Sequence, residues 1–434
     1  MQDIRSCDKK YSACGKIPHP LNGVPAAAGL LPAVAKVRQK PIRQPCQQAI
    51  DFGQGIIVFR IQQDPQTLCC GHCGSPKVTR AGTVPRRFRG LSIGSQPVYL
   101  ELPVQRLWCA SCGHTCQVHL SFADEKRTYT HGFERYALEL SAHMTILDVA
   151  RHLQVSWDVI KDIQKRYLYR HFAKPHLKHL QQIAIDEISI GRGHRYLTVV
   201  LDLQSGAVVF VGDGKGTAAL RPFWRSVRAA NARIRAVATD MSPAYILAVQ
   251  ENLPKAVHVF DRFHVMKLFN EQLPDLRREV QRTAEKVEHR QLLKGTLWLL
   301  LKNPENLDPK KHEPQRLQRA LRLNQPLATA YYLKEDLRQL WEQPDRPSAQ
   351  RFLNAWIDQA QASGVRMLHK FAQTLQLHRT GLLNWYRYRI STGPLEGTNT
   401  KIRVLQRQAY GFRDHEFFKL KIKALHQTTY ALVG

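Results

Sequence analysis

The chain has 434 residues, which is too long for one ordinary domain, and its 64 Lys and Arg exceed its 35 Asp and Glu, giving a formal net charge of +29. Such an excess of cations predicts a polyanionic partner, most commonly nucleic acid, because each cation near a phosphate releases condensed counterions; a membrane surface is the rival. No run of about 18 apolar residues is present, so we expect neither a spanning helix nor a signal peptide, and we predict a cytoplasmic protein.

The first segment, residues 1–54, is rich in Pro, Ala, Gln and basic residues and shows no sustained periodicity. We therefore expect a flexible or loosely ordered lead. Three of the nine cysteines, Cys7, Cys14 and Cys46, lie in this segment at spacings that match no zinc signature. We assign them no role.

Residues 55–125 alternate turn residues with short strand-like runs, which predicts a small β-rich domain. Two Cys-x-x-Cys pairs, Cys70 with Cys73 and Cys109 with Cys112, are each followed directly by a glycine. Paired thiolates on tight turns suit tetrahedral Zn²⁺, and four thiolates leave no open coordination position. The sequence therefore predicts a zinc ribbon with a structural role.

The choice of zinc ligands is open at two places. Cys69 is an alternative to Cys70, and His114 or Cys116 competes within the second pair. Free thiols without metal are the other interpretation. Basic residues and one tryptophan would give the ribbon a face that either touches phosphate or is simply solvated: Arg86, Arg87, Arg89, Arg106 and Trp108.

Residues 130–175 form a predicted helix-turn-helix domain. Within residues 145–161 two apolar stripes at helical spacing are separated by a break near Gln154, and Ser156 is a candidate N-cap for the second helix. Four residues of that helix are predicted to face DNA: Trp157, Lys161, Lys165 and Arg166. Asp158 and Asp162 weaken this interpretation, and a helical linker without a DNA role is the alternative.

The segment 180–264 predicts the first part of an α/β domain. Three strand candidates follow each other closely, and a helix, a strand, a further helix and a last strand come after them. The strands are expected at residues 183–190, 196–203, 207–211, 234–239 and 256–260, with the first helix at 217–230. Residues 265–389 look helical throughout and predict an all-helical insertion, and residues 390–434 predict a returning C-terminal helix of the same domain.

Three carboxylates stand out by position: Asp186 within the first strand, Asp240 at the end of the fourth, and Glu396 in the first helical turn after Pro394. Mg²⁺ or Mn²⁺ on shared carboxylates supplies what phosphoryl transfer on DNA needs. Without a cation, each like-charged pair at about 4 Å repels by roughly 4 kcal/mol at an effective dielectric near 20. We therefore predict a metal site at these three residues, with Glu187, Asp202 and Asp261 as competitors.

The helix that carries Glu396 adds groups suited to DNA. Its N-terminal dipole favours a charged carboxylate in the first turn. Asn399 and Arg403 follow on the same face, and Lys401 lies close by. We predict that these three residues hold DNA phosphate near the metal.

Several linked motifs carry a family resemblance from about Cys69 to the C-terminus. They are Cys70-Gly-His-Cys73, Trp108-Cys-Ala-Ser-Cys-Gly113, Ile185-Asp-Glu187, Gly193-His-Arg-Tyr196, Asp240-Met-Ser-Pro-Ala-Tyr245, Phe260-Asp-Arg-Phe-His-Val265, Ser391-Thr-Gly-Pro-Leu-Glu-Gly-Thr-Asn-Thr-Lys-Ile402 and Ala409-Tyr-Gly-Phe-Arg413. In this order they resemble the ISL3 family of insertion-sequence transposases. Arg192 stands where the family usually has Lys.

The resemblance implies an RNase H-like catalytic core interrupted by a helical insertion and preceded by a zinc and helix-turn-helix region. It implies a DDE transposase that binds terminal inverted repeats and catalyses metal-dependent cleavage and transfer of double-stranded DNA, with the triad on Asp186, Asp240 and Glu396. A homo-oligomer on DNA, associated with the nucleoid, is expected. The alternatives are a non-catalytic DNA-binding regulator and a structure-specific nuclease.

Overall fold

The computed structural model describes residues 55–191, 193, 195–283, 287–294 and 296–426. The predicted lead, with Cys7, Cys14 and Cys46, lies outside these residues. The chain divides into two compact units, and each is described by itself. The smaller contains Val58–Arg87 and Tyr99–Ser121, and the larger contains Phe88–Val98 and the chain from Phe122 onward.

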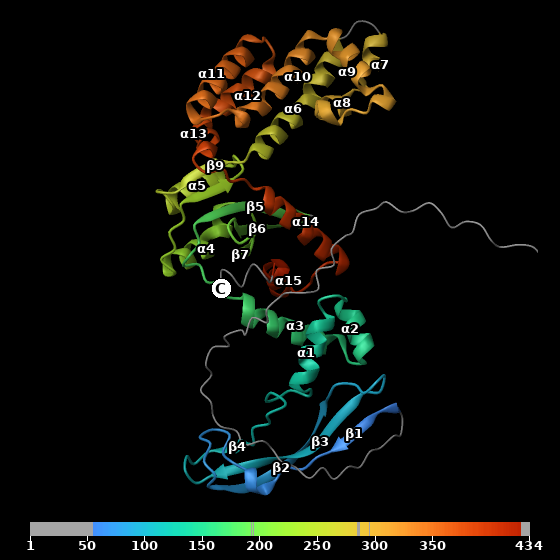
Figure 1. Ribbon diagram of the computed structural model, residues 1–434, viewed down its shortest axis with the longest axis vertical. Coiled ribbons are helices and arrows are strands. Elements are labelled where there is room, and N and C mark those ends of the chain that lie inside the picture. The colour runs from blue at the N-terminus through green and yellow to red at the C-terminus, as the bar shows by residue number, and fades with distance from the viewer. Residues whose placement is uncertain (1–54, 192, 194, 284–286, 295, 427–434) are drawn as a thin grey trace, which may run out of the picture. The chain divides into compact units, whose positions relative to one another are not determined.

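The smaller unit is built on a four-stranded sheet (Figure 1). Its strands are β1 (Ile57–Arg60), β2 (Val78–Arg89), β3 (Val98–Cys109) and β4 (Thr115–Gln117), in the order β1-β3-β2 with β4 paired antiparallel to β3. The long strands β2 and β3 carry a tight turn at one end. This arrangement agrees with the predicted β-rich domain.

The larger unit includes three helices that form the predicted helix-turn-helix: α1 (His131–Leu140), α2 (Ile146–Leu153) and α3 (Trp157–Phe172). Val149, Ile160 and Ile163 are fully buried between them. Gln154 ends α2 in the left-handed conformation, with φ at 53°, which makes the predicted break. Ser156 occupies the N-cap position of α3, but its side chain forms no capping hydrogen bond.

The α/β domain contains one five-stranded sheet in the order β7-β6-β5-β8-β9. Its strands are β5 (Gln182–Gly191), β6 (Arg195–Asp202), β7 (Val208–Asp213), β8 (Ala236–Thr239) and β9 (Val257–Phe260). The first three pair antiparallel, and β8 and β9 continue parallel to β5. All five predicted strands are confirmed, with ends shifted by at most two residues, and the topology is that of an RNase H-like core.

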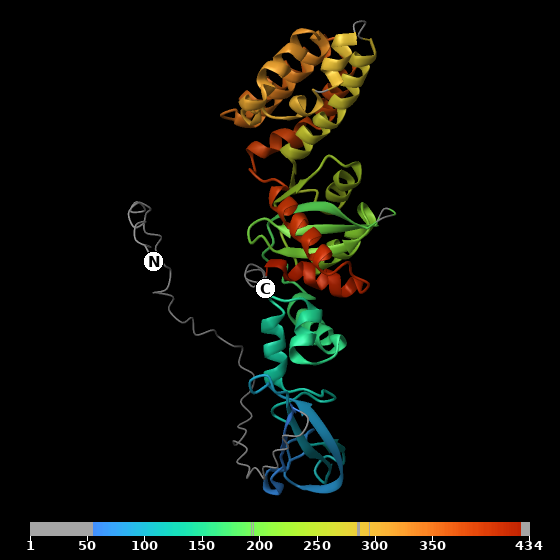
Figure 2. The same cartoon turned by 90° about the vertical axis from the view of Figure 1, so that its right-hand side faces the viewer.

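Helices cover both faces of this sheet. Strand residues Ile183 and Ile185 pack with α4 (Thr217–Ala229) and α5 (Pro243–Asn252). Ala184 and Ile188 point to the other face, where α14 (Gly393–Gln408) packs, because side chains alternate along a strand. Helix α15 (His415–Lys423) contributes to both cores. Figure 2 shows α14 and α15 in red against the green sheet.

The insertion is helical in all its described parts and has a hydrophobic core of its own. Its α-helices are α6 (Arg262–Thr283), α7 (Val287–Lys294), α8 (Leu297–Leu301), α9 (Glu313–Arg322), α10 (Gln325–Arg338), α11 (Arg346–Ala362), α12 (Arg366–Leu377) and α13 (Arg379–Leu383). Phe269, Trp356 and Phe371 pack edge to face at its centre. Among the described helices, none has both the length and the apolar character needed to cross a bilayer.

Gly381 of α13 allows the insertion to approach the sheet closely. A Cβ atom there would overlap the ring of Phe260, the last residue of β9, whereas Gly397 of α14 has open space around its Cα. We therefore expect Gly381→Ala to lower the free energy of unfolding by about 1–3 kcal/mol through overpacking. Gly397→Ala is the control, and we expect it to be neutral or stabilising by up to about 1 kcal/mol. Denaturant midpoints measure both, and equal midpoints for the two variants would contradict this account.

Candidate active site and zinc centre

The parallel strands bring three aspartates into one row. Ala184 of β5 lies opposite Ala238 of β8, which lies opposite Val259 of β9. Two residues further along each strand stand Asp186, Asp240 and Asp261, which the period of two places on the face covered by α14. Since paired strands are about 4.8 Å apart, the three carboxylates are neighbours at one edge of the sheet.

Helix α14 adds further groups to this row. Asn399 donates a hydrogen bond from Nδ2 to Asp186 Oδ2 at 2.8 Å, and the backbone N–H of Thr392 donates to Asp261 Oδ1 at 3.1 Å. Glu396 lies in the first turn of α14, with its carboxylate exposed. Both hydrogen bonds tie the chain that returns from the insertion to the strand ends.

His264, near the start of α6, is a site residue that the sequence did not single out. Its Nδ1 lies 3.2 Å from Asp261 Oδ2. On this edge of the described structure, the group whose ligand atoms all lie within 4.8 Å of one another is Asp261, His264 and Glu396. Asp186 and Asp240 lie close enough to interact electrostatically with His264. Glu396 groups there with Asp261 and His264, and the triad of Asp186, Asp240 and Glu396 stays a prediction.

The acids of this row do not titrate alike. Burial raises the pKa of Asp186 to about 6 and also raises the pKa of Asp240. Asp261 is buried too, but hydrogen bonds from His264 and Thr392 outweigh burial and hold its pKa below the ordinary value. The hydrogen bond to Asp261 raises the pKa of His264. Asp261 and His264 therefore favour each other's charged forms, beside two acids whose charged forms burial disfavours.

The hydrogen bonds show which oxygens of these acids are already occupied. Both oxygens of Asp261 accept N–H groups, because Oδ2 also accepts from the backbone of Phe263 and His264. Asp240 Oδ1 accepts from Ser242. Within the described part of the chain, no hydrogen bond occupies the second oxygen of Asp240 or the carboxylate of Glu396. Asp186 also accepts at both oxygens, from the N–H of Glu187 at Oδ1 and from Asn399 at Oδ2, so the oxygens without a hydrogen bond among these described acids belong to Asp240 and Glu396.

The donor set fits a hard divalent cation. Asp186, Asp240 and Glu396 offer carboxylate oxygens, the ligands that Mg²⁺ and Mn²⁺ prefer. Asn399 is 4 % exposed, and its Oδ1 is buried without a hydrogen-bond partner. Such an orphaned acceptor suits a cation or the water that it carries. This environment differs from the predicted contact of Asn399 with DNA, because the amide is buried against Asp186.

The remaining competitors have other partners. Glu187 alternates to the opposite side of β5, where its Oε2 accepts a 2.6 Å hydrogen bond from the hydroxyl of buried Tyr245. Asp202 is 5 % exposed and accepts from Gln204 and Ser205 in the turn before β7. Both carboxylates are therefore engaged in local structure.

Three of the four residues of helix α3 that we predicted to face DNA form ion pairs within the protein. Lys161 and Lys165 lie 3.2 and 2.8 Å from the carboxylate of Asp414, and Arg166 lies 2.6 Å from Glu134. These pairs tie α3 to the segment before α15 and to α1. Trp157 is 43 % exposed at the start of α3 and is the freest of the four. On α14, by contrast, Lys401 and Arg403 are exposed close to Glu396 in sequence.

Four cysteines of the smaller unit gather in the geometry of a zinc site. Cys70 Sγ lies 3.7 Å from Cys112 Sγ, Cys73 Sγ lies 3.6 Å from Cys109 Sγ, and all four sulfurs lie within 4.8 Å of one another. Zn–S bonds of about 2.3 Å in a tetrahedron require sulfurs at about this spacing. Backbone N–H groups of Cys73 and His72 lower the pKa of Cys70 to about 6, which favours the thiolate.

The glycines and the neighbouring ligand candidates complete this centre. Gly74 and Gly113 follow the two pairs with φ at 72° and 69°, and their N–H groups bond to Cys70 and Cys109. Cys69 is exposed outside the cluster, so Cys70 is the member of the first pair. Cys116 Sγ lies 3.6 Å from Cys70 Sγ and is a fifth nearby thiol.

Comparison with known proteins agrees with this organisation. The profile described as a transposase of the ISL3 type matches residues 183–422, more than half of the chain. The chain belongs to the ISL3 family of insertion-sequence transposases. Two further ISL3 profiles match, a helix-turn-helix domain of transposase family ISL3 at 118–168 and a zinc finger of transposases IS204/IS1001/IS1096/IS1165 at 66–112. This ISL3 transposase is therefore a DNA-binding enzyme with a structural zinc ribbon.

Similar transposases are found in bacteria. The transposase for IS1001 of Bordetella parapertussis is 33 % identical over 377 residues, covering 86 % of this chain and 92 % of that protein. The transposase for IS1557 of Mycobacterium tuberculosis is 30 % identical over 391 residues, covering 84 % and 87 %. The Drosophila P element transposase strand transfer complex aligns with 57 % of this chain and 78 % of its own at 12 % identity, with a TM-score of 0.33, which carries no inference.

The zinc assignment predicts different effects for different cysteines. We expect Cys109→Ser to abolish the zinc content of the purified protein and to destabilise the smaller unit, because a structural zinc site contributes folding free energy directly. Cys69→Ser is the matched control and should retain one zinc per chain. Metal analysis by mass spectrometry measures both. A Cys116→Ser variant that loses its zinc would show that Cys116 is a ligand.

The opposite pKa shifts of two aspartates predict opposite pH dependences in metal-free protein. The raised pKa of Asp186 means that its ionisation opposes folding above about pH 4, so Asp186→Asn should stabilise the protein by about 1–2 kcal/mol at pH 8, and the gain should vanish toward pH 4. The lowered pKa of Asp261 means that its charge stabilises the fold, so Asp261→Asn should destabilise at neutral pH, with the loss shrinking in acid. Unfolding curves in chelator across this range measure both. Curves with the same sign for the two variants would refute the assignment.

Proposed function

We propose that this transposase binds the terminal inverted repeats of its insertion sequence and uses Asp186, Asp240 and Glu396 with Mg²⁺ or Mn²⁺ to cleave and join DNA strands. The observation that supports this most directly is the strand register: Asp186 and Asp240 each follow by two residues the paired Ala184 and Ala238, and Asn399 of α14 donates a hydrogen bond to Asp186. Divalent ions shared by such carboxylates activate the attacking oxygen and stabilise the leaving oxygen of a phosphodiester.

The chain's own residues prepare this chemistry. Asn399 fixes the orientation of Asp186 through its 2.8 Å hydrogen bond. Asp261 holds His264 and the start of α14, and it favours the protonated imidazolium of His264. A cation at this position counters charge on the scissile phosphate and is able to donate a proton to a leaving oxygen.

We assign the remaining steps of DNA binding to the other domains. The helix-turn-helix and the zinc ribbon hold the inverted repeat. Trp157, an exposed aromatic at the start of α3, contacts DNA, and Lys161, Lys165 and Arg166 do so where their internal ion pairs open. Lys401 and Arg403 hold the backbone close to Glu396. Transposition requires two ends to be held together, so we expect a homo-oligomer on DNA. We propose the same domain boundaries as those predicted from the sequence.

Two conservative substitutions test the catalytic assignment. We expect Asp240→Asn and Glu396→Gln to reduce cleavage of the element's own ends in Mn²⁺ at least about 100-fold, because losing a metal ligand removes several kcal/mol of transition-state stabilisation. Binding to the same ends should be preserved. Asp358→Asn on the exposed face of α11 is the control. Wild-type protein that binds the ends but never cuts them would favour the non-catalytic regulator instead.

A further inference from the structure

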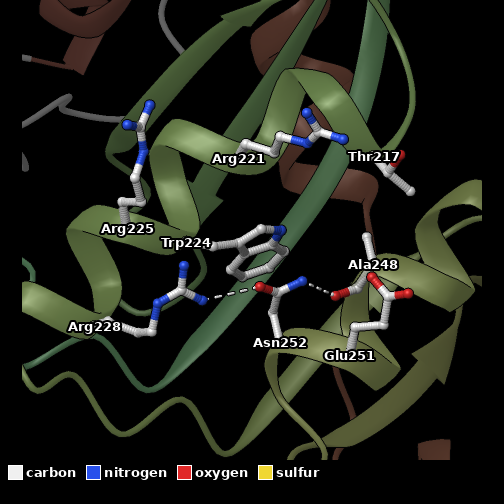
Figure 3. A pocket seen from close by; sticks show the side chains of 8 residues that line it. All are labelled: Thr217, Arg221, Trp224, Arg225, Arg228, Ala248, Glu251 and Asn252. Atoms are coloured by element: carbon white, nitrogen blue, oxygen red, sulfur yellow. Dashed lines mark hydrogen bonds between the residues drawn. The ribbon is translucent and has the colours of Figure 1, made fainter.

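Helices α4 and α5 border a hollow of about 580 Å³ on the face of the sheet opposite α14. Figure 3 shows the side chains that line it, which come from both helices. They are Thr217, Arg221, Trp224, Arg225, Arg228, Ala248, Glu251 and Asn252. None of these residues belongs to the proposed catalytic edge or to the helix-turn-helix.

The hollow carries an excess of positive charge. Arg221, Arg225 and Arg228 are exposed and follow one side of α4 at spacings of four and three residues. In the described part of the chain, none of the three forms an ion pair with a carboxylate. Arg228 donates from Nη1 to Asn252 Oδ1 at 3.1 Å, which holds its guanidinium at the rim. Glu251 is the single acid among the lining residues, so the cations outnumber it.

A buried hydrogen-bond donor also lacks a partner there. The side chain of Trp224 is 3 % exposed, and its Nε1 has no hydrogen-bond partner among the described residues. Leaving such a donor unsatisfied costs about 1–3 kcal/mol. In Figure 3 the indole nitrogen faces the space between Arg221 and Thr217. An acceptor placed in the hollow would satisfy it.

The start of α4 adds a third feature to the same place. Gly216 is its N-cap and offers no side chain to the free N–H groups of the first turn, which contains no acid. The N-terminus of a helix attracts anions through these N–H groups and the helix dipole. Thr217, the first residue of α4, lines the hollow together with the unpartnered Trp224. The exposed arginines, the unpartnered indole N–H and the helix N-terminus all favour an oxyanion as the ligand.

We propose that this hollow seats a phosphate of the DNA backbone, accepting hydrogen bonds from Trp224 Nε1 and Arg221, while Arg225 and Arg228 hold neighbouring phosphates. A row of arginines over seven residues of helix spans about 10 Å, longer than one phosphate group and suited to successive phosphates of a strand. The carboxylate row lies on the opposite face, so the DNA held here is a second segment, separate from the strand being cut.

The first experiment compares two charge-matched double variants of the full chain. Fluorescence anisotropy with a labelled duplex of unrelated sequence gives the affinity across a range of KCl concentrations. For Arg221→Gln/Arg225→Gln we expect a salt dependence shallower by about 1.8 and binding about tenfold or more weaker near 0.1 M salt, because each lost phosphate contact removes about 0.9 from the slope. Arg319→Gln/Arg322→Gln, exposed on α9, is the control and should retain the slope. Equal losses in both variants would overturn the proposal, since net charge alone would then explain them.

A second experiment tests the buried donor and the source of the phosphate. Trp224→Phe keeps an aromatic ring but removes the N–H together with part of the buried indole, so we expect it to weaken duplex binding about fivefold, the effect of one hydrogen bond, and to lower the melting temperature through the cavity that it leaves. Inorganic pyrophosphate is the other probe. If Arg221→Gln/Arg225→Gln loses pyrophosphate binding but binds duplex normally, the hollow serves a free phosphate compound and the DNA proposal fails. A failure of the hollow proposal shows in duplex binding without metal, whereas a failure of the catalytic assignment shows in Mn²⁺-dependent cleavage, so the two remain distinguishable.

Discussion

The hydrogen-bonded register of β5, β8 and β9 decides where the acids of this transposase lie. Ala184, Ala238 and Val259 face one another across the three strands, so Asp186, Asp240 and Asp261 follow in one row. A slip of one residue would turn an aspartate to the face covered by α4 and α5. The helical insertion separates β9 from α14 in the chain and has a hydrophobic core of its own. Its C-terminal end must therefore bring α14 back to this row of aspartates. The hydrogen bonds that Thr392 and Asn399 donate to Asp261 and Asp186 secure that return.

The buried aspartates of this row lower the stability of the metal-free protein and serve its proposed function. Burial raises the pKa of Asp186 to about 6, so the metal-free protein keeps a carboxylate in an environment that disfavours its charge. Asp261 is also buried, but hydrogen bonds from His264 and Thr392 outweigh that penalty. At Asp186 and Asp240 burial outweighs the hydrogen bonds that they accept, and we propose that a divalent cation offsets it. Perturbed pairs of this kind are typical of catalytic sites, where positive charge arrives with the metal.

The sequence predicted what depends on local pattern and missed what depends on distant contacts. The choice of Asp186, Asp240 and Glu396 followed from a position within the first strand, a strand end and the helix start at Pro394, and the strands themselves were found within two residues. His264 was missed, although its spacing of three from the strand-end Asp261 was a usable signal. The buried setting of Asn399 and the pairing of Lys165 with Asp414 involve residues more than 200 positions apart, which no local periodicity encodes. A cation on a predicted recognition helix thus either faces DNA or forms an ion pair within the protein, and only tertiary packing decides between the two.

The two faces of the sheet give this basic chain a way to hold more than one DNA segment. On one face, α14 exposes Lys401 and Arg403 beside Glu396; on the other, α4 exposes the arginines of the Trp224 hollow. Electrostatic attraction alone would draw a polyanion to either face, since the net charge is +29. What distinguishes the faces is the buried group at each: carboxylates that require a cation at one, and an indole N–H that requires an acceptor at the other. A phosphate satisfies the second directly, whereas the carboxylates of the first would repel it unless a divalent cation were bound there, so on our proposal a metal is needed for cutting and not for holding DNA on the second face.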